Sequence, residues 1–137
     1  MGGHASARET GKGGYQLVID AGGHGLIADE PWALGGLDSG PAPYDLLCAA
    51  LSACTTMTLR MVAQRKGWPL ETIRVAITHS RDEAQNPPDL FTREITLTGA
   101  LDEEQRQRLL DIAGRCPVHK TLAGGARIAS SLASQDS

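Results

Sequence analysis

A long helical pattern that is apolar on nearly every face constrains the fold of this chain more than any other feature. Pro43 suits a first helical turn, and the pattern runs from Tyr44 to about Lys66, before Gly67 offers a stop. One stripe recurs at spacings of three and four, and comprises Leu47, Ala50, Leu51, Cys54, Met57, Thr58 and Met61. The remaining faces are small or apolar too, so we expect the helix to be buried all round. A domain of this size rarely surrounds a helix by itself, which favours an intimate homodimer.

Strand patterns occur in pairs on both sides of that helix. They cover residues 15–20, 24–29, 73–79 and 91–99, with a short, weak strand at 126–129. Further helical patterns cover 102–115 and 118–122. Strands paired through turns predict largely antiparallel sheets, so the expected fold class is α+β around a long buried central helix. We expect one domain over residues 1–137, with a flexible N-terminus at 1–13 and a flexible tail at 133–137.

Charge and composition exclude several classes of protein. The net charge of −3 leaves no basic footprint for nucleic acid. No segment approaches the roughly 20 apolar residues of a membrane span, so no membrane partner is expected. The first residues lack the apolar region of a signal peptide. Three cysteines are an odd number, which argues against a secreted disulfide framework and favours the cytoplasm.

Two of the three cysteines are candidates for thiol redox chemistry. Cys54 lies mid-helix among small residues that leave room for a ligand, and Thr55 and Thr56 follow it with hydroxyl groups. Cys116 precedes a proline and a short helical pattern, and a helix N-terminus can activate a thiol. Burial as a small hydrophobic residue remains the alternative for Cys54. Cys48 lies on another helix face, about 240° from Cys54, and is interpreted as a packing residue.

The histidines allow one further hypothesis. His119 could join Cys54 and Cys116 in a metal site, although a partly exposed helix residue is the plainer interpretation. His24 and the pair Asp29–Glu30 lie on or after a predicted strand, where a solvated edge is expected. His79 is expected at the surface.

Two segments resemble the OsmC/Ohr family. Gly40-Pro41-Ala42-Pro43-Tyr44-Asp45-Leu46-Leu47, running on through Ala53-Cys54-Thr55-Thr56 to Arg60, is similar to its central-helix motif. Cys116-Pro117-Val118-His119-Lys120-Thr121-Leu122 is similar to its second cysteine motif. The resemblance extends over residues 15–132. It implies an intertwined homodimer with sites at the dimer interface.

The resemblance also implies a function. It implies a thiol-dependent peroxidase that reduces organic hydroperoxides in oxidative-stress defence, with no cofactor. Cys54 would be the peroxidatic cysteine that becomes a sulfenic acid, and Cys116 the resolving cysteine that forms a disulfide with it. An external dithiol would then restore both thiols.

The chain departs from the family pattern at two supporting positions. Well-studied members carry a glutamate ten residues before the peroxidatic cysteine, where this chain has Tyr44. Asp45, one residue further on, is the candidate substitute, with a shorter side chain turned about 100° round the helix. They also carry an arginine in the N-terminal β region, for which Arg8 and His24 are the candidates in this chain. The chain therefore resembles a branch that lacks the usual Glu and Arg. A non-enzymatic dimer that binds a small molecule, and the Cys/His metal site, remain the alternatives.

Overall fold

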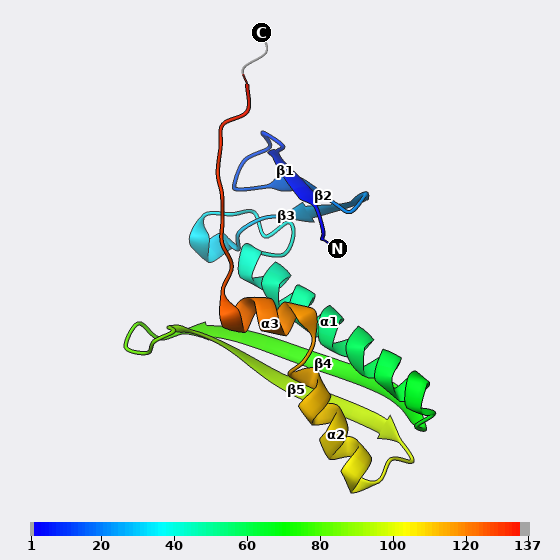
Figure 1. Cartoon of the computed structure of the whole chain (residues 1–137). Coiled ribbons are helices and arrows are strands. Elements are labelled where there is room, and N and C mark those ends of the chain that lie inside the picture. Colours follow the sequence, from blue (N-terminus) through cyan, green and yellow to red (C-terminus); the bar gives the residue numbers. More distant parts are fainter. Residues whose placement is uncertain (1, 135–137) are drawn as a thin grey trace. The chain divides into compact units, whose positions relative to one another are not determined.

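The computed structural model describes residues 2–134 and has an α+β fold, which confirms the expected class (Figure 1). The elements are β1 (Ala5–Glu9), β2 (Leu17–Ala21), β3 (His24–Ala28), a 3₁₀ turn (Trp32–Leu34), α1 (Pro43–Lys66), β4 (Leu70–Arg81), β5 (Asp89–Gly99), α2 (Glu103–Ala113) and α3 (Pro117–Gly124). They form two compact units. The first runs to Ala50 and includes Ile77–Arg93, and the second comprises Leu51–Ala76 and the chain from Glu94 onward.

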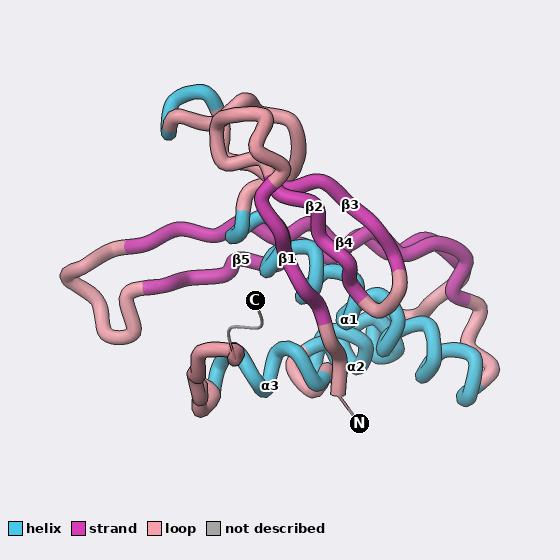
Figure 2. The backbone as a smooth tube through the Cα atoms, turned by 90° about the horizontal axis from the view of Figure 1, so that it is seen from above, coloured by secondary structure: helices cyan, strands magenta, loops and turns pink. Residues whose placement is uncertain are grey.

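The first unit contains a three-stranded antiparallel sheet in the order β1-β2-β3 (Figure 2). Its register places Arg8 opposite Val18, and Val18 opposite Ile27. The predicted flexible N-terminus at 1–13 is therefore wrong over β1. All five β1 side chains are exposed, so the strand shows no apolar alternation. Its order comes from backbone hydrogen bonds to β2, which a hydropathy pattern does not reveal.

A buried carboxylate organises the loop after β3. Asp29 is 2% exposed, and its oxygens accept hydrogen bonds from the backbone N–H groups of Tyr15, Glu30, Leu37 and Ser39 and from the Ser39 hydroxyl at 2.6 Å. Gly36 passes so close that a Cβ there would lie 1.8 Å from the carbonyl oxygen of Glu30. The expected solvated edge is wrong for Asp29, because this carboxylate satisfies loop amides that would otherwise be left unpaired.

These hydrogen bonds give the stability of the first unit a pH dependence. The Ser39 hydroxyl, with the backbone amides, lowers the pKa of Asp29 from 3.8 to about 2. A depressed pKa adds stability above pH 4, and that stability is lost as the pH falls towards 2. We expect Asp29→Asn to lower the Tm at pH 7 by about 5 °C or more, since the amide NH₂ would face N–H donors.

Thermal unfolding followed by circular dichroism from pH 7 to pH 2 checks this expectation. The wild type should lose Tm steeply below pH 4, and Asp29→Asn should lose less over the same range. Glu30→Gln is the matched control, because Glu30 contributes only backbone atoms to this network. Equal pH profiles for wild type and Asp29→Asn would contradict the role of the carboxylate.

The second unit has an aliphatic core between α1, the β4–β5 hairpin and α2. Its fully or nearly buried members are Leu59, Ala63, Leu70, Leu109, Ile112 and Ala113. Asp102 starts α2 with a capping box, in which its carboxylate accepts the Gln105 N–H and the Gln105 side chain accepts the Asp102 N–H. The core therefore packs the C-terminal half of α1 against α2. The chain continues from α2 directly into α3.

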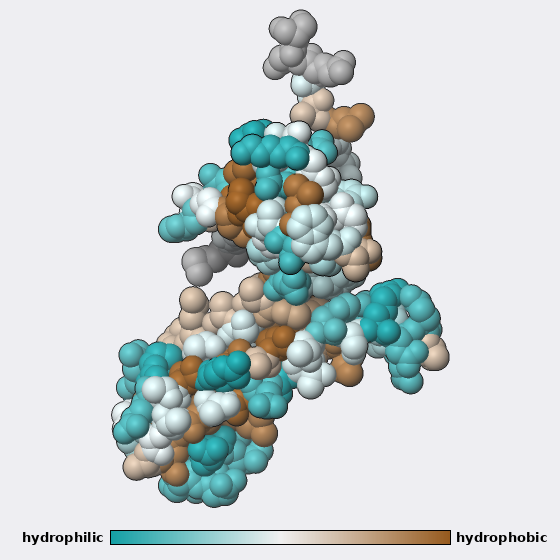
Figure 3. Space-filling model, turned by 180° about the vertical axis from the view of Figure 1, so that it is seen from behind, coloured by the Kyte–Doolittle hydropathy of each residue, from teal (hydrophilic) through white to brown (hydrophobic). Residues whose placement is uncertain are grey.

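The α1 helix has the predicted bounds but a different buried face. The buried residues are Leu51, Thr55, Leu59 and Ala63, one turn apart, whereas Met57 is 68% and Met61 is 52% exposed. Figure 3 shows hydrophobic side chains exposed among hydrophilic ones on one face of the molecule. Burial all round is thus wrong for the single chain, because a helix apolar on every side does not reveal which side its own chain covers.

The same composition makes α1 long and apolar enough to cross a membrane, with a mean hydropathy of 1.6 over 18 residues, of which 22% are buried. This differs from the expectation that no segment approaches a membrane span. A single such helix is a weak indication, because the core helix of a water-soluble protein has the same properties.

The C-terminal segment differs from its prediction in one respect. Residues 126–129 form no strand, and Ile128 is 89% exposed. A four-residue strand needs a paired edge, and no strand pairs with this segment in the described residues. Of the expected flexible tail, residues 135–137 lie outside the described part of the chain.

Candidate functional site

Cys116 lies at the N-cap of α3, as the sequence predicts, and it is fully buried. Its backbone is extended, with φ −66° and ψ 144°, and Pro117 occupies the first helical turn. The Cys116 Sγ accepts the backbone N–H of His119 at 3.4 Å. Sulfur therefore takes the place that a serine or aspartate oxygen has in most N-caps. A thiol in this position faces the positive end of the helix dipole.

Tertiary packing brings this thiol against the central helix. The Cys116 Sγ lies 3.8 Å from the Thr55 Oγ1, a contact across 61 positions of sequence. Thr55 directly follows Cys54, which is half-buried in the same compact unit. Both cysteines are free thiols in the structure. The two cysteine motifs are therefore neighbours, although the residue that touches Cys116 is Thr55.

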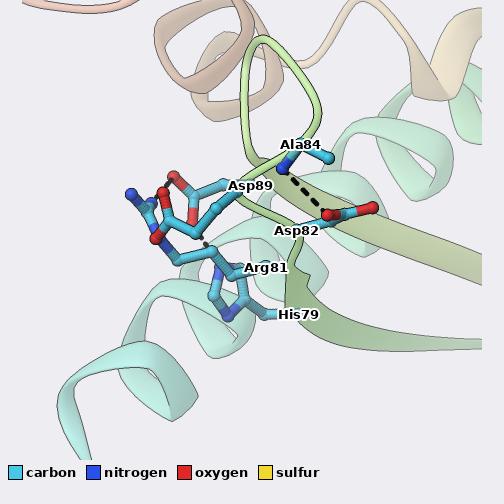
Figure 4. A network of polar contacts seen from close by, with 6 residues as sticks. His79, Arg81, Asp82, Ala84 and Asp89 are labelled. Atoms are coloured by element: carbon cyan, nitrogen blue, oxygen red, sulfur yellow. Dashed lines mark hydrogen bonds and ion pairs between the residues drawn. The ribbon is translucent and has the colours of Figure 1, made fainter.

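A second polar cluster lies in the first unit, around His79. The Tyr44 ring stacks on the His79 ring at 4.2 Å between centroids, and the Phe91 ring lies 4.9 Å from His79 on a tilted plane. The His79 Nε2 is 2.8 Å from the Asp89 Oδ1, and the Arg81 Nη1 is 2.8 Å from the Asp89 Oδ2 (Figure 4). Hydrogen bonding from His79, followed by that from Arg81, lowers the pKa of Asp89.

This cluster overturns the surface position predicted for His79, whose side chain is only 13% exposed. It also gives Tyr44 a role that the sequence did not suggest. Tyr44 stands where the resemblance places a glutamate, and in this chain it is a ring partner of an imidazole. No local signal marks Tyr44 for this contact, because Tyr44 is on α1 and His79 is on β4.

Cys48 and Asp45 line a cavity of about 340 Å³ in the first unit, together with Tyr44, Ile77, Thr78 and His79. Burial, and secondarily the nearby Asp45 carboxylate, raise the pKa of the Cys48 thiol. That direction disfavours the thiolate form of Cys48. Asp45 accepts the Ala42 N–H at 3.0 Å and so stabilises the start of α1.

Three further residues are predicted to support the site. Arg8 and His24 are exposed on β1 and β3, and His119 is half-buried on α3. Among residues 2–134 there is no group of three or more His, Cys, Asp or Glu side chains that could hold a metal ion. The hypothetical metal site of Cys54, Cys116 and His119 is therefore not assembled in this structure.

The fold and the paired cysteine motifs can be compared with known proteins. The family model for OsmC-like proteins matches residues 36–131, which include α1, both predicted redox cysteines and α3. The chain belongs to the OsmC-like family. No match was found among curated protein sequences.

Solved structures of OsmC-like proteins have the same fold. An OsmC-like protein from Mycoplasma pneumoniae superposes with a TM-score of 0.75 at 18% identity, covering 90% of this chain and 89% of the other. An organic hydroperoxide resistance protein OsmC from Legionella pneumophila gives a TM-score of 0.66 at 20% identity, with 90% of both chains covered. The organic hydroperoxide resistance protein OhrB of Bacillus subtilis gives 0.62 at 23% identity, covering 90% of this chain and 92% of the other.

Proposed function

We propose that this OsmC-like protein is a thiol-dependent peroxidase that reduces organic hydroperoxides to alcohols. The observation that carries the proposal is the position of the Cys116 thiol, 3.8 Å from Thr55 and therefore beside the helical turn that bears Cys54. Membership of a family with organic hydroperoxide resistance proteins among its solved structures supports the same reaction class.

The proposed reaction has three steps. The Cys54 thiol loses its proton, and the thiolate attacks the terminal oxygen of the hydroperoxide. The O–O bond breaks, Cys54 becomes a sulfenic acid, and the alkoxide takes up the proton and leaves as an alcohol. The Cys116 thiol then attacks the Cys54 sulfur, forming a disulfide and releasing water. An external dithiol reduces the disulfide by exchange and is itself oxidised. We place the reaction in the cytoplasm, because an odd number of cysteines argues against a secreted disulfide framework.

The half-buried state of Cys54 suits the first step, because a peroxide must reach the sulfur while bulk water is largely kept away. The full burial of Cys116 suits the second step, because the resolving thiol is then protected from wasteful oxidation by the substrate.

The test is a thiol and mass analysis of the reduced wild-type protein after one equivalent of cumene hydroperoxide. We expect loss of two thiols, a Cys54–Cys116 disulfide in the peptide map, and one equivalent of cumyl alcohol. Hydrogen peroxide at the same concentration should react more slowly. Absence of both disulfide and alcohol would reject the peroxidase and favour a non-catalytic binding protein.

We further propose that the active form is a homodimer formed through the exposed face of α1. Met57 and Met61 are exposed there, beside a groove of about 340 Å³ that they share with Thr56, Arg60, Gln64 and Ile73. Burying a methionine side chain contributes roughly 1.5–3 kcal/mol of free energy. Covering this face with a second copy of the chain would therefore favour association.

Sedimentation of the wild type should give twice the 14.5 kDa mass of one chain. The double variant Met57→Glu, Met61→Glu should sediment as a monomer, because it places carboxylates in the buried interface. Leu34→Glu is the control, since Leu34 is 64% exposed but lies in the loop after β3. A monomeric wild type at micromolar concentration contradicts this proposal.

A further inference from the structure

The contact between Thr55 and Cys116 joins two polar groups that are both completely buried. Buried hydroxyl and thiol groups need hydrogen-bond partners, because water is not there to replace a missing one. Thr55 has a second contact: its Oγ1 lies 2.7 Å from the backbone carbonyl oxygen of Leu51, one turn earlier in α1. Cys116 has its own second contact, with the His119 N–H.

These contacts assign the hydrogen atoms. A threonine hydroxyl carries one hydrogen and can accept through its lone pairs, and a carbonyl oxygen can only accept. The Thr55 hydrogen therefore belongs to the 2.7 Å bond with Leu51. It follows that the Cys116 S–H donates to the Thr55 oxygen, while the sulfur accepts from the His119 N–H.

We propose that Thr55 is a positioning residue for the Cys116 thiol. In the resting protein its oxygen accepts the S–H and holds the sulfur against α1. When the thiol loses its proton, rotation about the Thr55 Cβ–Oγ1 bond lets the hydroxyl donate to the thiolate, and Leu51 keeps its ordinary helical N–H partner. The role rests on the proposed peroxidase, because it concerns the second step of that reaction.

Thr55 contributes to that step without exchanging atoms with the substrate. The Cys116 sulfur forms a bond to the Cys54 sulfur, the S–O bond of the sulfenic acid breaks, and the proton of Cys116 leaves with the hydroxide as water. The sulfenic sulfur is reduced and the Cys116 sulfur is oxidised, both to the disulfide level. A hydroxyl that stabilises the Cys116 thiolate in a buried site raises the fraction of sulfur able to attack.

The test compares Thr55→Val, which keeps the shape and removes the hydroxyl, with Thr55→Ser, which keeps the hydroxyl. Single-turnover reactions with cumene hydroperoxide are quenched with dimedone, which traps sulfenic acid, and with an alkylating agent. We expect Thr55→Val to oxidise Cys54 at the wild-type rate, to form the disulfide at least about 10-fold more slowly, and to accumulate trapped sulfenic acid. Thr55→Ser should restore most of the rate. An unchanged rate of disulfide formation in Thr55→Val overturns the proposal.

A second readout is independent of peroxidase activity. In a Cys48→Ser, Cys54→Ser protein, Cys116 is the sole thiol, and its S–H stretch can be followed by infrared spectroscopy. We expect the band at lower wavenumber when Thr55 is present than in the same protein with Thr55→Val or Thr55→Ala. Identical bands overturn the assigned hydrogen bond. If wild-type Cys54 does not oxidise but the band shift is present, the proposed peroxidase activity is rejected. The hydrogen bond between Cys116 and Thr55 then still stands.

Discussion

Cys54→Ser is expected to lower the rate of cumene hydroperoxide reduction by at least about 1,000-fold, to the rate of the uncatalysed reaction. A serine hydroxyl cannot form the sulfenic acid on which both later steps depend. Cys116→Ser should behave differently. It should still oxidise once at Cys54, but it should trap the sulfenic acid and lose turnover with a dithiol that reduces only disulfides. Steady-state assays of alcohol formation with the dithiol as reductant measure both variants.

The chain supplies its own control for this experiment in Cys48, which lies on the same helix. Cys48 lines the cavity near His79, and burial raises the pKa of its thiol. We therefore expect Cys48→Ser to retain nearly full activity. If Cys48→Ser is inactive while Cys54→Ser is active, the peroxidatic cysteine has been assigned to the wrong residue.

Leu109→Ala is expected to lower the free energy of unfolding by about 2–5 kcal/mol. Leu109 is completely buried on α2 and belongs to the core cluster that includes Leu59 and Ala63 from α1. Truncation leaves a cavity between these helices, because the close-packed surroundings relax only partly to fill it. Because α3 follows α2 directly, we also expect faster exchange of the α3 amides.

Urea unfolding at one fixed protein concentration measures the stability change, since an oligomer would make it depend on concentration. Leu110→Ala is the matched control on the next residue of α2, where the side chain is 55% exposed. It should change the free energy of unfolding by under about 0.5 kcal/mol. A similar loss in both variants would contradict a core that buries Leu109 and leaves Leu110 outside.

The sequence predicted the regular elements well where local signals were strong. The bounds of α1 followed from Pro43, the apolar run and Gly67, and the β4–β5 hairpin followed from alternation. It failed at β1, whose side chains are all exposed, and at residues 126–129, which have no strand partner among the described residues. At β1 the deciding factor is backbone pairing with β2, and at residues 126–129 it is the lack of a partner strand among the described residues. Neither factor leaves a local pattern.

The residues of the candidate site also differ in whether local signals in the sequence could predict their surroundings. Cys116 was recognisable as a helix N-cap because the Cys-Pro step is a local signal, and the structure has that cap. Asp29 was misjudged because its partners come from Tyr15, Leu37 and Ser39, which are spread along the chain. His79 was misjudged because its neighbours Tyr44 and Asp89 lie on other elements.

The sequence by itself therefore determined the order of the strands and α-helices from β2 to α3, the long apolar helix and the two cysteine motifs, because periodicity, caps and turn residues act within a few positions of the chain. Only the tertiary structure decided which face of α1 its own chain covers, and that Thr55 is the residue against the Cys116 thiol. Helix periodicity is equally satisfied by several faces of an apolar helix. The choice among them is made by core packing with α2 and the hairpin.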